Sequence, residues 1–340
     1  MKALVKFEKG LDGAELRDIK KQVPDDDELL VKIISVGICG TDIHILKDEY
    51  PCNMPVVLGH EYTGIIEQFG NSVTNFKEGD QIISSTAVYT CENCEYCVQG
   101  LRMLCERRLS IGSGINGAMA EYITVPAKLA YKVPDRFKDS YSIAAAEPLA
   151  CAVRAVIEQS KIRSGDVVLI SGPGPIGLFI LQLAKLAGTF VIVAGIESDK
   201  ERLDTAKQLG ADVICYNPLE LEKIIKEISY HGVDVAYECA GTISSINECI
   251  NLLKKGGNLS QVGLFGKTVD LDIDKILCKE LQWTVSFASE ISSWDILLKI
   301  LSQGYLDLDR IITDIFDLEE WRTALDVVLK KKGLKVLLRP

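Results

Sequence analysis

The chain has 340 residues and a formal net charge of −10 at pH 7, with a sequence pI near 5.0. This length predicts about two domains, and a hydrophobic content of 47% is sufficient for a buried core. The excess of acidic side chains argues against a nucleic-acid partner. No apolar run approaches the length of a membrane span, and residues 2–7 show a strand-like pattern rather than a targeting segment. We therefore expect a cytoplasmic protein with neither a membrane nor a nucleic-acid partner.

The first 135 residues are predicted to form short strands and turns. Residues 29–36 are a strand candidate, and residues 56–69 form another that is interrupted by Gly59 and Gly64. No helical periodicity persists in this part of the chain. Residues 140–158 then show an alanine-rich helical pattern, for which Ser140 is a candidate cap and Pro148 predicts a break or restart.

After this helix the chain alternates between apolar β-rich runs and helical stretches. This alternation predicts an α/β fold, a doubly wound parallel sheet. Beyond residue 289 there are two more helical stretches around a short strand at 311–312. The six strand candidates of the sheet are 167–171, 190–194, 213–216, 233–238, 259–263 and 283–288.

A glycine-rich turn follows the first of these strands and opens a helix. In its G-x-G-x-x-G pattern, Gly172 makes the tight turn, Gly174 allows a pyrophosphate to approach, and Gly177 allows the helix to pack on the strand. The helix N-terminus then favours the negative phosphates. The alternative is a glycine-rich connection that binds nothing, which this context disfavours. The turn therefore predicts a dinucleotide site.

An acidic residue after the next strand should hold the ribose hydroxyls. Glu197 lies about 20 residues after Gly177, the spacing that the fingerprint requires. Its carboxylate would repel a 2′-phosphate, which favours NAD. In a competing interpretation Glu197 belongs to a helix start with a capping box at Ser198. Lys200 and Arg202 are close enough to keep NADP as a minority alternative.

Four cysteines with the spacing C-x2-C-x2-C-x7-C predict a structural metal site. An iron–sulfur cluster prefers a tighter final spacing and a following proline, and disulfides are typical of small secreted domains. Four thiolates around Zn²⁺ form a closed tetrahedral site that can hold a loop without a hydrophobic core. The predicted ligands are Cys91, Cys94, Cys97 and Cys105.

Candidate ligands for a second metal ion occur upstream, outside the four-cysteine loop. They are the thiol of Cys39, the imidazole of His60 and the carboxylate of Glu61. Each alone would more often be a core thiol, a satisfied core histidine or an ordinary acid. Their joint occurrence in this order favours metal ligation.

These segments, the four-cysteine loop and the glycine turn together resemble the zinc-dependent medium-chain alcohol/polyol dehydrogenases over essentially the whole chain. The resemblance implies a GroES-like β-rich catalytic domain of residues 1–152 and 289–340, with the structural zinc lobe at about 88–108. It implies a Rossmann NAD-binding domain of residues 153–288 with a six-stranded parallel sheet, and an active site in the cleft. Relatives of this kind are usually homodimers or homotetramers, paired through a strand such as 283–288.

The same resemblance implies roles for individual residues. The third ligand position carries Glu147 where classical alcohol dehydrogenases have a second cysteine, which points to the sorbitol dehydrogenase branch. Either Glu61 or Glu147 then coordinates the zinc. Thr41 and His44 are candidates for a proton relay, against a loop threonine that caps a helix and an exposed histidine. Further cofactor contacts implied by position are Pro175, Ile176, Arg202, Val262, Leu264 and Phe287.

We therefore expect a zinc-dependent oxidoreductase that reversibly oxidises a secondary alcohol of a polyol or sugar alcohol to a ketone, with hydride transfer to NAD. One alternative is an alditol-phosphate or L-threonine-type dehydrogenase of the same fold. Another is a zinc-stabilised NAD-binding module without activity, and a zinc-free quinone reductase is a third. The open metal position that the ligand set predicts argues against the last two.

Overall fold

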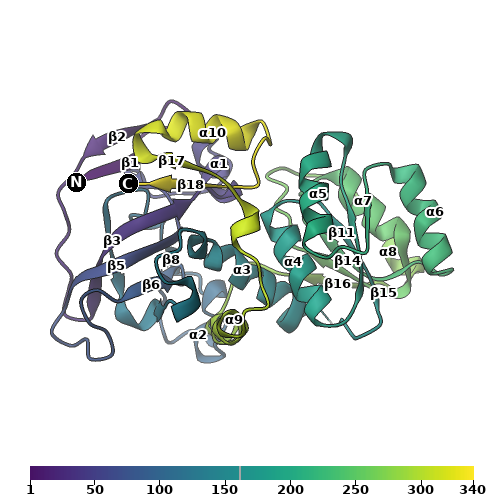
Figure 1. The fold of residues 1–340 in the computed structure, drawn as a ribbon, viewed down its shortest axis with the longest axis horizontal. Coiled ribbons are helices and arrows are strands. Elements are labelled where there is room, and N and C mark those ends of the chain that lie inside the picture. The colour runs from purple at the N-terminus through teal and green to yellow at the C-terminus, as the bar shows by residue number, and fades with distance from the viewer. Residues whose placement is uncertain (161) are drawn as a thin grey trace. The chain divides into compact units, whose positions relative to one another are not determined.

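The computed structural model describes residues 1–160 and 162–340, which divide into two compact units (Figure 1). The first unit contains Met1–Glu147, Ser289–Gly304 and Ile312–Pro340. The second contains Pro148–Ala288 and Tyr305–Ile311. Each is described separately. The contacts thus assign residues 148–152 and 305–311 to the second unit, whereas the sequence-based limits assign them to the first.

The first unit is built mainly from β-strands. Its largest sheet has seven strands. Six of them are hydrogen-bonded neighbours in one path, and the seventh, β9, pairs with β3 outside that path. That path runs β10 (Ala130–Lys132), β6 (Gln81–Ser84), β5 (Glu61–Phe69), β3 (Glu28–Gly37), β18 (Lys335–Arg339) and β17 (Ile312–Asp317), and β9 is Tyr122–Pro126. Two smaller sheets are β2 (Ala14–Asp18), β1 (Lys2–Lys6) and β4 (Val56–Val57), and β7 (Ala87–Tyr89) with β8 (Leu109–Ser110).

Strand β3 lies at the centre of this unit, and its burial explains why. Seven of its ten residues are buried, so both of its faces are covered. It pairs antiparallel with β5, β9 and β18. Leu29, Val31 and Val36 belong to the hydrophobic core of the unit. Burial of such side chains contributes roughly 1.5–3 kcal/mol each, which holds the C-terminal strands β17 and β18 against the N-terminal part of the chain (Figure 1).

Helices of the first unit are short or peripheral. They are α1 (Gly40–Leu46), α2 (Glu95–Val98), α9 (Ile291–Gln303) and α10 (Trp321–Leu329). Single 3₁₀ turns occur at Arg102–Leu104, Ala127–Leu129, Asp135–Phe137, Ser142–Ala145 and Leu318–Glu320. The predicted helix at 140–158 is divided: the 3₁₀ turn at Ser142–Ala145 is followed by α3 (Ala146–Val153) and a π-helical segment, Arg154–Gln159. The change to α-helix occurs two residues before Pro148, in agreement with the expected restart.

The second unit contains a six-stranded, all-parallel sheet, as the sequence predicted. Its order is β13 (Val213–Cys215), β12 (Phe190–Ala194), β11 (Val167–Ser171), β14 (Val233–Glu238), β15 (Leu253–Gln261) and β16 (Gln282–Val285). Three strands have the predicted bounds. The largest difference is β15, which begins at Leu253 rather than at residue 259, because its irregular first part carries polar and glycine residues.

Five helices connect these strands. They are α4 (Pro175–Leu186), α5 (Lys200–Gln208), α6 (Pro218–Ile228), α7 (Ile243–Leu252) and α8 (Ile273–Cys278), with a 3₁₀ turn at Glu197–Asp199 and another at Asp309–Ile311. Because parallel crossovers are right-handed, α4 and α5 cover one face of the sheet and α6, α7 and α8 cover the other (Figure 1). In the described part of the chain, no helix is both long and apolar enough to span a bilayer.

Candidate active site and zinc centres

The four-cysteine loop folds as the spacing predicts. Cys91 follows β7, Cys94 caps α2, Cys97 lies within that helix, and Cys105 follows the 3₁₀ turn Arg102–Leu104. Their sulfur atoms all lie within 4.8 Å of one another. The Cys91 sulfur is 3.9 Å from that of Cys97 and 3.6 Å from that of Cys105. None of the cysteines in the described part of the chain forms a disulfide.

These distances match a tetrahedral zinc site. With Zn–S bonds of about 2.3 Å, neighbouring sulfur atoms should be about 3.8 Å apart, whereas a disulfide requires about 2.05 Å. The N–H of Asn93 lowers the pKa of Cys91 to about 6. Burial, with Cys94 and Cys105, raises the pKa of Cys97 to about 11. Such crowded thiolates need a cation to ionise together, and zinc supplies it.

The second predicted set of ligands also comes together, in the first unit. Cys39 precedes α1 at the end of β3, and His60 and Glu61 lie at the start of β5. Because β3 and β5 are antiparallel, with Gly37 opposite Glu61, the end of one strand lies beside the start of the other. Ligand atoms of the three side chains lie within 4.8 Å of one another. Thiolate, imidazole and carboxylate fit a catalytic zinc ion, with a fourth position left for substrate.

Asp42, which the sequence reasoning did not select, contacts the backbone and the histidine of this site. Its side chain is 1% exposed, and one carboxylate oxygen accepts a hydrogen bond from the N–H of Cys39 at 2.8 Å. The other oxygen accepts from the N–H of Gly59 at 3.3 Å and lies 3.6 Å from Nδ1 of His60. Burial lowers the pKa of His60, but Asp42 and then Cys39 raise it well above its usual value overall. A carboxylate in this position orients a ligating histidine.

Lys335 is a second residue that the sequence reasoning missed. Its ammonium group lies 2.6 and 2.9 Å from the two carboxylate oxygens of Glu61, and both side chains are almost fully buried. It also donates to the carbonyl oxygen of Ile38 at 3.2 Å. Lys335 is 274 residues from Glu61 in the chain, so only the pairing of β18 with β3 brings them together. The carboxylate that faces the metal site therefore also has a fixed cationic partner.

The relay candidates Thr41 and His44 both lie on α1. The hydroxyl of Thr41 is 3.7 Å from the sulfur of Cys39, and α1 begins at Gly40, so Thr41 is not its cap. His44 is partly exposed, and its Nδ1 lies 2.7 Å from the carboxylate of Glu49. Glu147 is buried at the start of α3, and it is not among the three residues whose ligand atoms cluster.

The glycine turn has the form that a dinucleotide site requires. Gly172 has φ +110°, and a Cβ there would lie 2.8 Å from the amide nitrogen of Ala240. A Cβ at Gly177 would overlap the carbonyl oxygen of Gly172, so close packing of α4 on the turn requires glycine. A Cβ at Gly174 would meet no atom within 4 Å, which leaves open space before the N-terminus of α4. Pyrophosphate fits such an opening.

The other predicted cofactor residues lie around the same sheet edge. Glu197 is exposed in the 3₁₀ turn after β12. At the start of this turn the carboxylate of Asp199 accepts a hydrogen bond from the N–H of Ile196 at 3.1 Å, so the cap is formed by Asp199 and not at Ser198 as predicted. Arg202 lies in α5, where burial lowers its pKa. Pro175 and Ile176 begin α4, Val262 and Leu264 follow β15, and Phe287 follows β16. Their contacts with a cofactor stay predictions.

A dinucleotide turn on a parallel sheet, a cysteine–histidine–glutamate metal group and a four-cysteine zinc lobe define a zinc-dependent oxidoreductase. Residues 25–135 match the family model of the alcohol dehydrogenase GroES-like domain, and residues 175–303 match that of the zinc-binding dehydrogenases. The chain belongs to this family of NAD(P)-dependent zinc alcohol/polyol dehydrogenases.

Individual relatives cover the whole chain. It is 40% identical to D-arabitol-phosphate dehydrogenase of Enterococcus avium, over 99% of this chain and 97% of that protein. It is 34% identical to sorbitol dehydrogenase of Halalkalibacterium halodurans, over 100% and 99%. A solved structure of a putative zinc-binding dehydrogenase from Sinorhizobium meliloti 1021, bound to NADP, has a TM-score of 0.89 at 32% identity, covering 100% of this chain and 99% of that one.

Proposed function

We propose that this protein oxidises a secondary alcohol of a polyol to a ketone and transfers the hydride to NAD⁺, with release of one proton. The observation that carries the proposal is the cluster of Cys39, His60 and Glu61, because three protein ligands leave a position for a substrate oxygen. Similarity to a sorbitol dehydrogenase supports the substrate class. When bound, zinc lowers the pKa of an alcohol as a Lewis acid, and the nicotinamide ring accepts hydride.

The residues of the chain then have distinct tasks. Thr41, whose hydroxyl lies 3.7 Å from the sulfur of Cys39, is positioned to accept a hydrogen bond from the substrate hydroxyl. His44, half-buried on the same helix, passes the proton toward solvent. Glu61 or Glu147 supplies the carboxylate of the metal site, and a second substrate hydroxyl bonds to Glu147. Asp42 holds His60 in place from behind.

The cofactor assignment depends on Glu197. Its place after β12 is where an acid would bond the ribose hydroxyls and repel a 2′-phosphate, which supports NAD. The NADP in the Sinorhizobium meliloti structure, and Lys200 and Arg202 nearby in this chain, support the alternative. A comparison of NAD⁺ and NADP⁺ as oxidants tests the assignment directly.

A second candidate substrate is an alditol phosphate. The 40% identity with D-arabitol-phosphate dehydrogenase favours it, since that value exceeds the 34% identity with the sorbitol enzyme. The chemistry at the secondary alcohol is the same for both substrates. They differ in a phosphate group, which would require cationic side chains around that end of the substrate.

The deciding experiment measures reduction of NAD⁺ and NADP⁺ by absorbance with matched pairs of substrates. D-arabitol, sorbitol and galactitol are each compared with their monophosphates, and xylitol, 2,3-butanediol and L-threonine complete the panel. We expect turnover with a polyol that is abolished by a chelator and by Cys39→Ser, but not by the matched control Cys52→Ser. If a monophosphate has the higher kcat/KM, the second candidate is correct. If the zinc-loaded enzyme reduces neither cofactor with any alditol or alditol monophosphate, both candidate substrate classes are refuted.

We also propose that the protein is a homodimer or homotetramer in which subunits pair through β16. This strand is the edge of the parallel sheet, and Trp283, Val285 and Phe287 are 39%, 64% and 45% exposed. An apolar edge strand with free backbone groups is suited to sheet extension. Light scattering of Val285→Lys should show monomers where the unmodified chain shows an oligomer. We also propose a cytoplasmic location, where cysteines stay reduced, as they are in the described part of the chain.

A further inference from the structure

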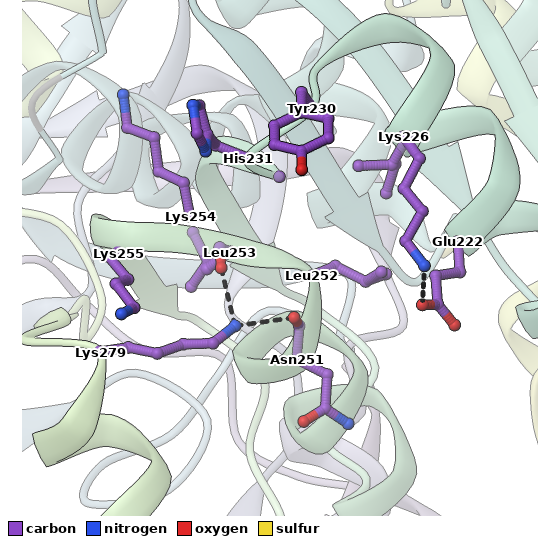
Figure 2. A pocket seen from close by; sticks show the side chains of 12 residues that line it. Glu222, Lys226, Tyr230, His231, Asn251, Leu252, Leu253, Lys254, Lys255 and Lys279 are labelled. Carbon is purple, nitrogen blue, oxygen red and sulfur yellow. Dashed lines mark hydrogen bonds and ion pairs between the residues drawn. The ribbon is translucent and has the colours of Figure 1, made fainter.

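A pocket in the second unit lies far along the sheet from the glycine turn. It has a cavity of about 590 Å³, a size suited to small molecules. The loop after α6, the junction of α7 with β15, and Lys279 after α8 line it (Figure 2). These segments lead into the amino ends of β14 and β15, whereas Gly172 follows the carboxyl end of β11. Since the strands are parallel, the two sites lie at opposite ends of the strands of one sheet.

Positive charge dominates this pocket, although the chain has a net charge of −10. Glu222 is the one acidic residue of the lining, and His231 adds an imidazole. We call this site the lysine pocket after the four lysines that line it: Lys226, Lys254, Lys255 and Lys279.

Two of these lysines have a structural task that accounts for them. Lys279 donates to three backbone carbonyls, those of Ile250, Asn251 and Leu253, at 2.7–2.8 Å. It thereby offsets the partial negative charge at the end of α7. Lys226 pairs with Glu222 one helical turn earlier, at 2.7 Å. These contacts account for Lys279 and Lys226, which leaves Lys254 and Lys255 as the lysines of the pocket without a structural task of this kind.

Lys254 and Lys255 are presented by an irregularity of β15. The pairing register shifts between Val233 and Val235, and residues 254–257 lie outside it. Gly256 in this segment has φ +72°, which allows the chain to turn there. Such bulges re-aim side chains. Lys254 pairs with Asp234 and retains two further N–H donors. Within the described chain, the ammonium group of Lys255 has no hydrogen-bond or ion-pair partner.

Tyr230 and His231 line the side of the pocket opposite Lys255. Tyr230 is 87% exposed, and its ring meets the His231 ring edge-on at a centroid distance of 5.1 Å. Two hydrogen bonds close the loop that carries both: the hydroxyl of Ser229 donates to the carbonyl of Gly232 at 2.7 Å, and the N–H of Gly232 donates to the carbonyl of Ser229 at 3.2 Å. Figure 2 shows Tyr230 and His231 along one side of the pocket, with Lys255 and Lys279 across it. Such a ring offers a stacking surface.

We propose that the lysine pocket binds a small molecule that carries a phosphate group. The phosphate lies against Lys255, and the organic part of the ligand packs on the ring of Tyr230. The site is separate from the zinc and dinucleotide sites and is independent of the proposed catalytic function.

The test is isothermal titration of the full-length, zinc-loaded protein with inorganic pyrophosphate, and then with ADP. Titrations are repeated in excess NADH, because the glycine turn also attracts phosphates. Lys255→Ala should weaken pyrophosphate binding by about tenfold, the contribution of a hydrogen bond between charged groups. Lys223→Ala is the matched control: it removes an equal, exposed charge from α6 at a position that does not line the pocket. It should leave binding unchanged.

ADP and Tyr230→Ala test the organic part of the ligand. ADP should bind more tightly than pyrophosphate, and only the ADP affinity should fall in Tyr230→Ala. The variants change exposed side chains, and an unchanged melting temperature confirms that they fold. Absence of pyrophosphate binding, or equal binding by Lys255→Ala and Lys223→Ala, would overturn the proposal. Equal affinities for ADP and pyrophosphate would overturn the role of Tyr230.

Discussion

Replacement of Lys335 by methionine should destabilise the metal-free protein and have a smaller effect on the zinc-loaded protein. Methionine retains most of the buried stem of Lys335 but removes the ammonium group that lies 2.6 and 2.9 Å from the oxygens of Glu61. Burial opposes the charge of Lys335, but Glu61 and then Cys39 raise its pKa overall. Lys335 is therefore charged at neutral pH, and the substitution leaves the buried carboxyl group of Glu61 without its cationic partner.

The magnitude follows from the burial of both partners. Glu61 is fully buried and the side chain of Lys335 is 4% exposed, so solvent cannot replace the lost partner. Removal of one member of such a pair costs about 3–5 kcal/mol. For a chain of 340 residues, that loss corresponds to a fall in Tm of roughly 4–7 °C. A zinc ion beside Glu61 supplies positive charge to the same carboxylate, so zinc should restore a large part of the stability.

The assay is thermal unfolding of the wild type, Lys335→Met, Glu61→Gln and the double variant, each with and without zinc. Because the double variant removes both charges, it should be less destabilised in the metal-free state than Lys335→Met alone. If metal-free Lys335→Met unfolds at the wild-type temperature, the reasoning is wrong. An equal loss with and without zinc would show that the metal does not share the Glu61 carboxylate.

Four further predictions concern the metal sites and the relay. Cys39→Ser should abolish turnover but leave dinucleotide binding, measured by titration, largely intact; wild-type kcat in a purified sample would contradict the zinc assignment. Cys91→Ser should lower the melting temperature and remove one zinc ion per chain by elemental analysis, and unchanged values would show that the lobe holds no metal. Zinc at the catalytic site should dissociate as the pH falls, because the raised pKa of His60 favours its protonated form, which cannot bind metal. A catalytic zinc content that is constant from pH 8 to pH 5 in dialysed protein would exclude competition between protons and zinc for His60. Glu49→Gln should lower kcat and alter its pH profile with little change in KM, because the carboxylate 2.7 Å from Nδ1 of His44 orients that ring; a change in KM alone would place Glu49 outside the relay.

Local sequence patterns predicted the strand alternation of the second unit and the bounds of three of its six strands. Strands β11, β12 and β14 have the predicted bounds, because continuous apolar runs between helical stretches are typical of strands buried on both faces. The glycine turn was also predictable, since Gly172 and Gly177 occupy positions where a side chain would overlap the backbone. The first part of β15 was not, because Gly256 and Gly257 interrupt the apolar pattern within the strand.

The candidate metal site was predictable in its ligands but not in its surroundings. Cys39, His60 and Glu61 could be selected by chemistry and family order, and the structure brings them together. Asp42 gave no signal, since an acid near a helix start is ordinary. The pair formed by His44 and Glu49 depends on the turn after α1, whose conformation no short motif specifies.

The sequence alone determined which chemistry this protein can carry. Its thiol, imidazole and carboxylate groups and the glycines of its dinucleotide turn are properties of residue type and spacing. Only the tertiary structure decided which charges face each other in the interior. Lys335 reaches Glu61 because β18 pairs with β3, and β3 in turn pairs with β5. Pairing between distant strands depends on the burial of whole sheet faces rather than on local spacing. The electrostatic environment of the metal site is therefore a product of the assembled sheet.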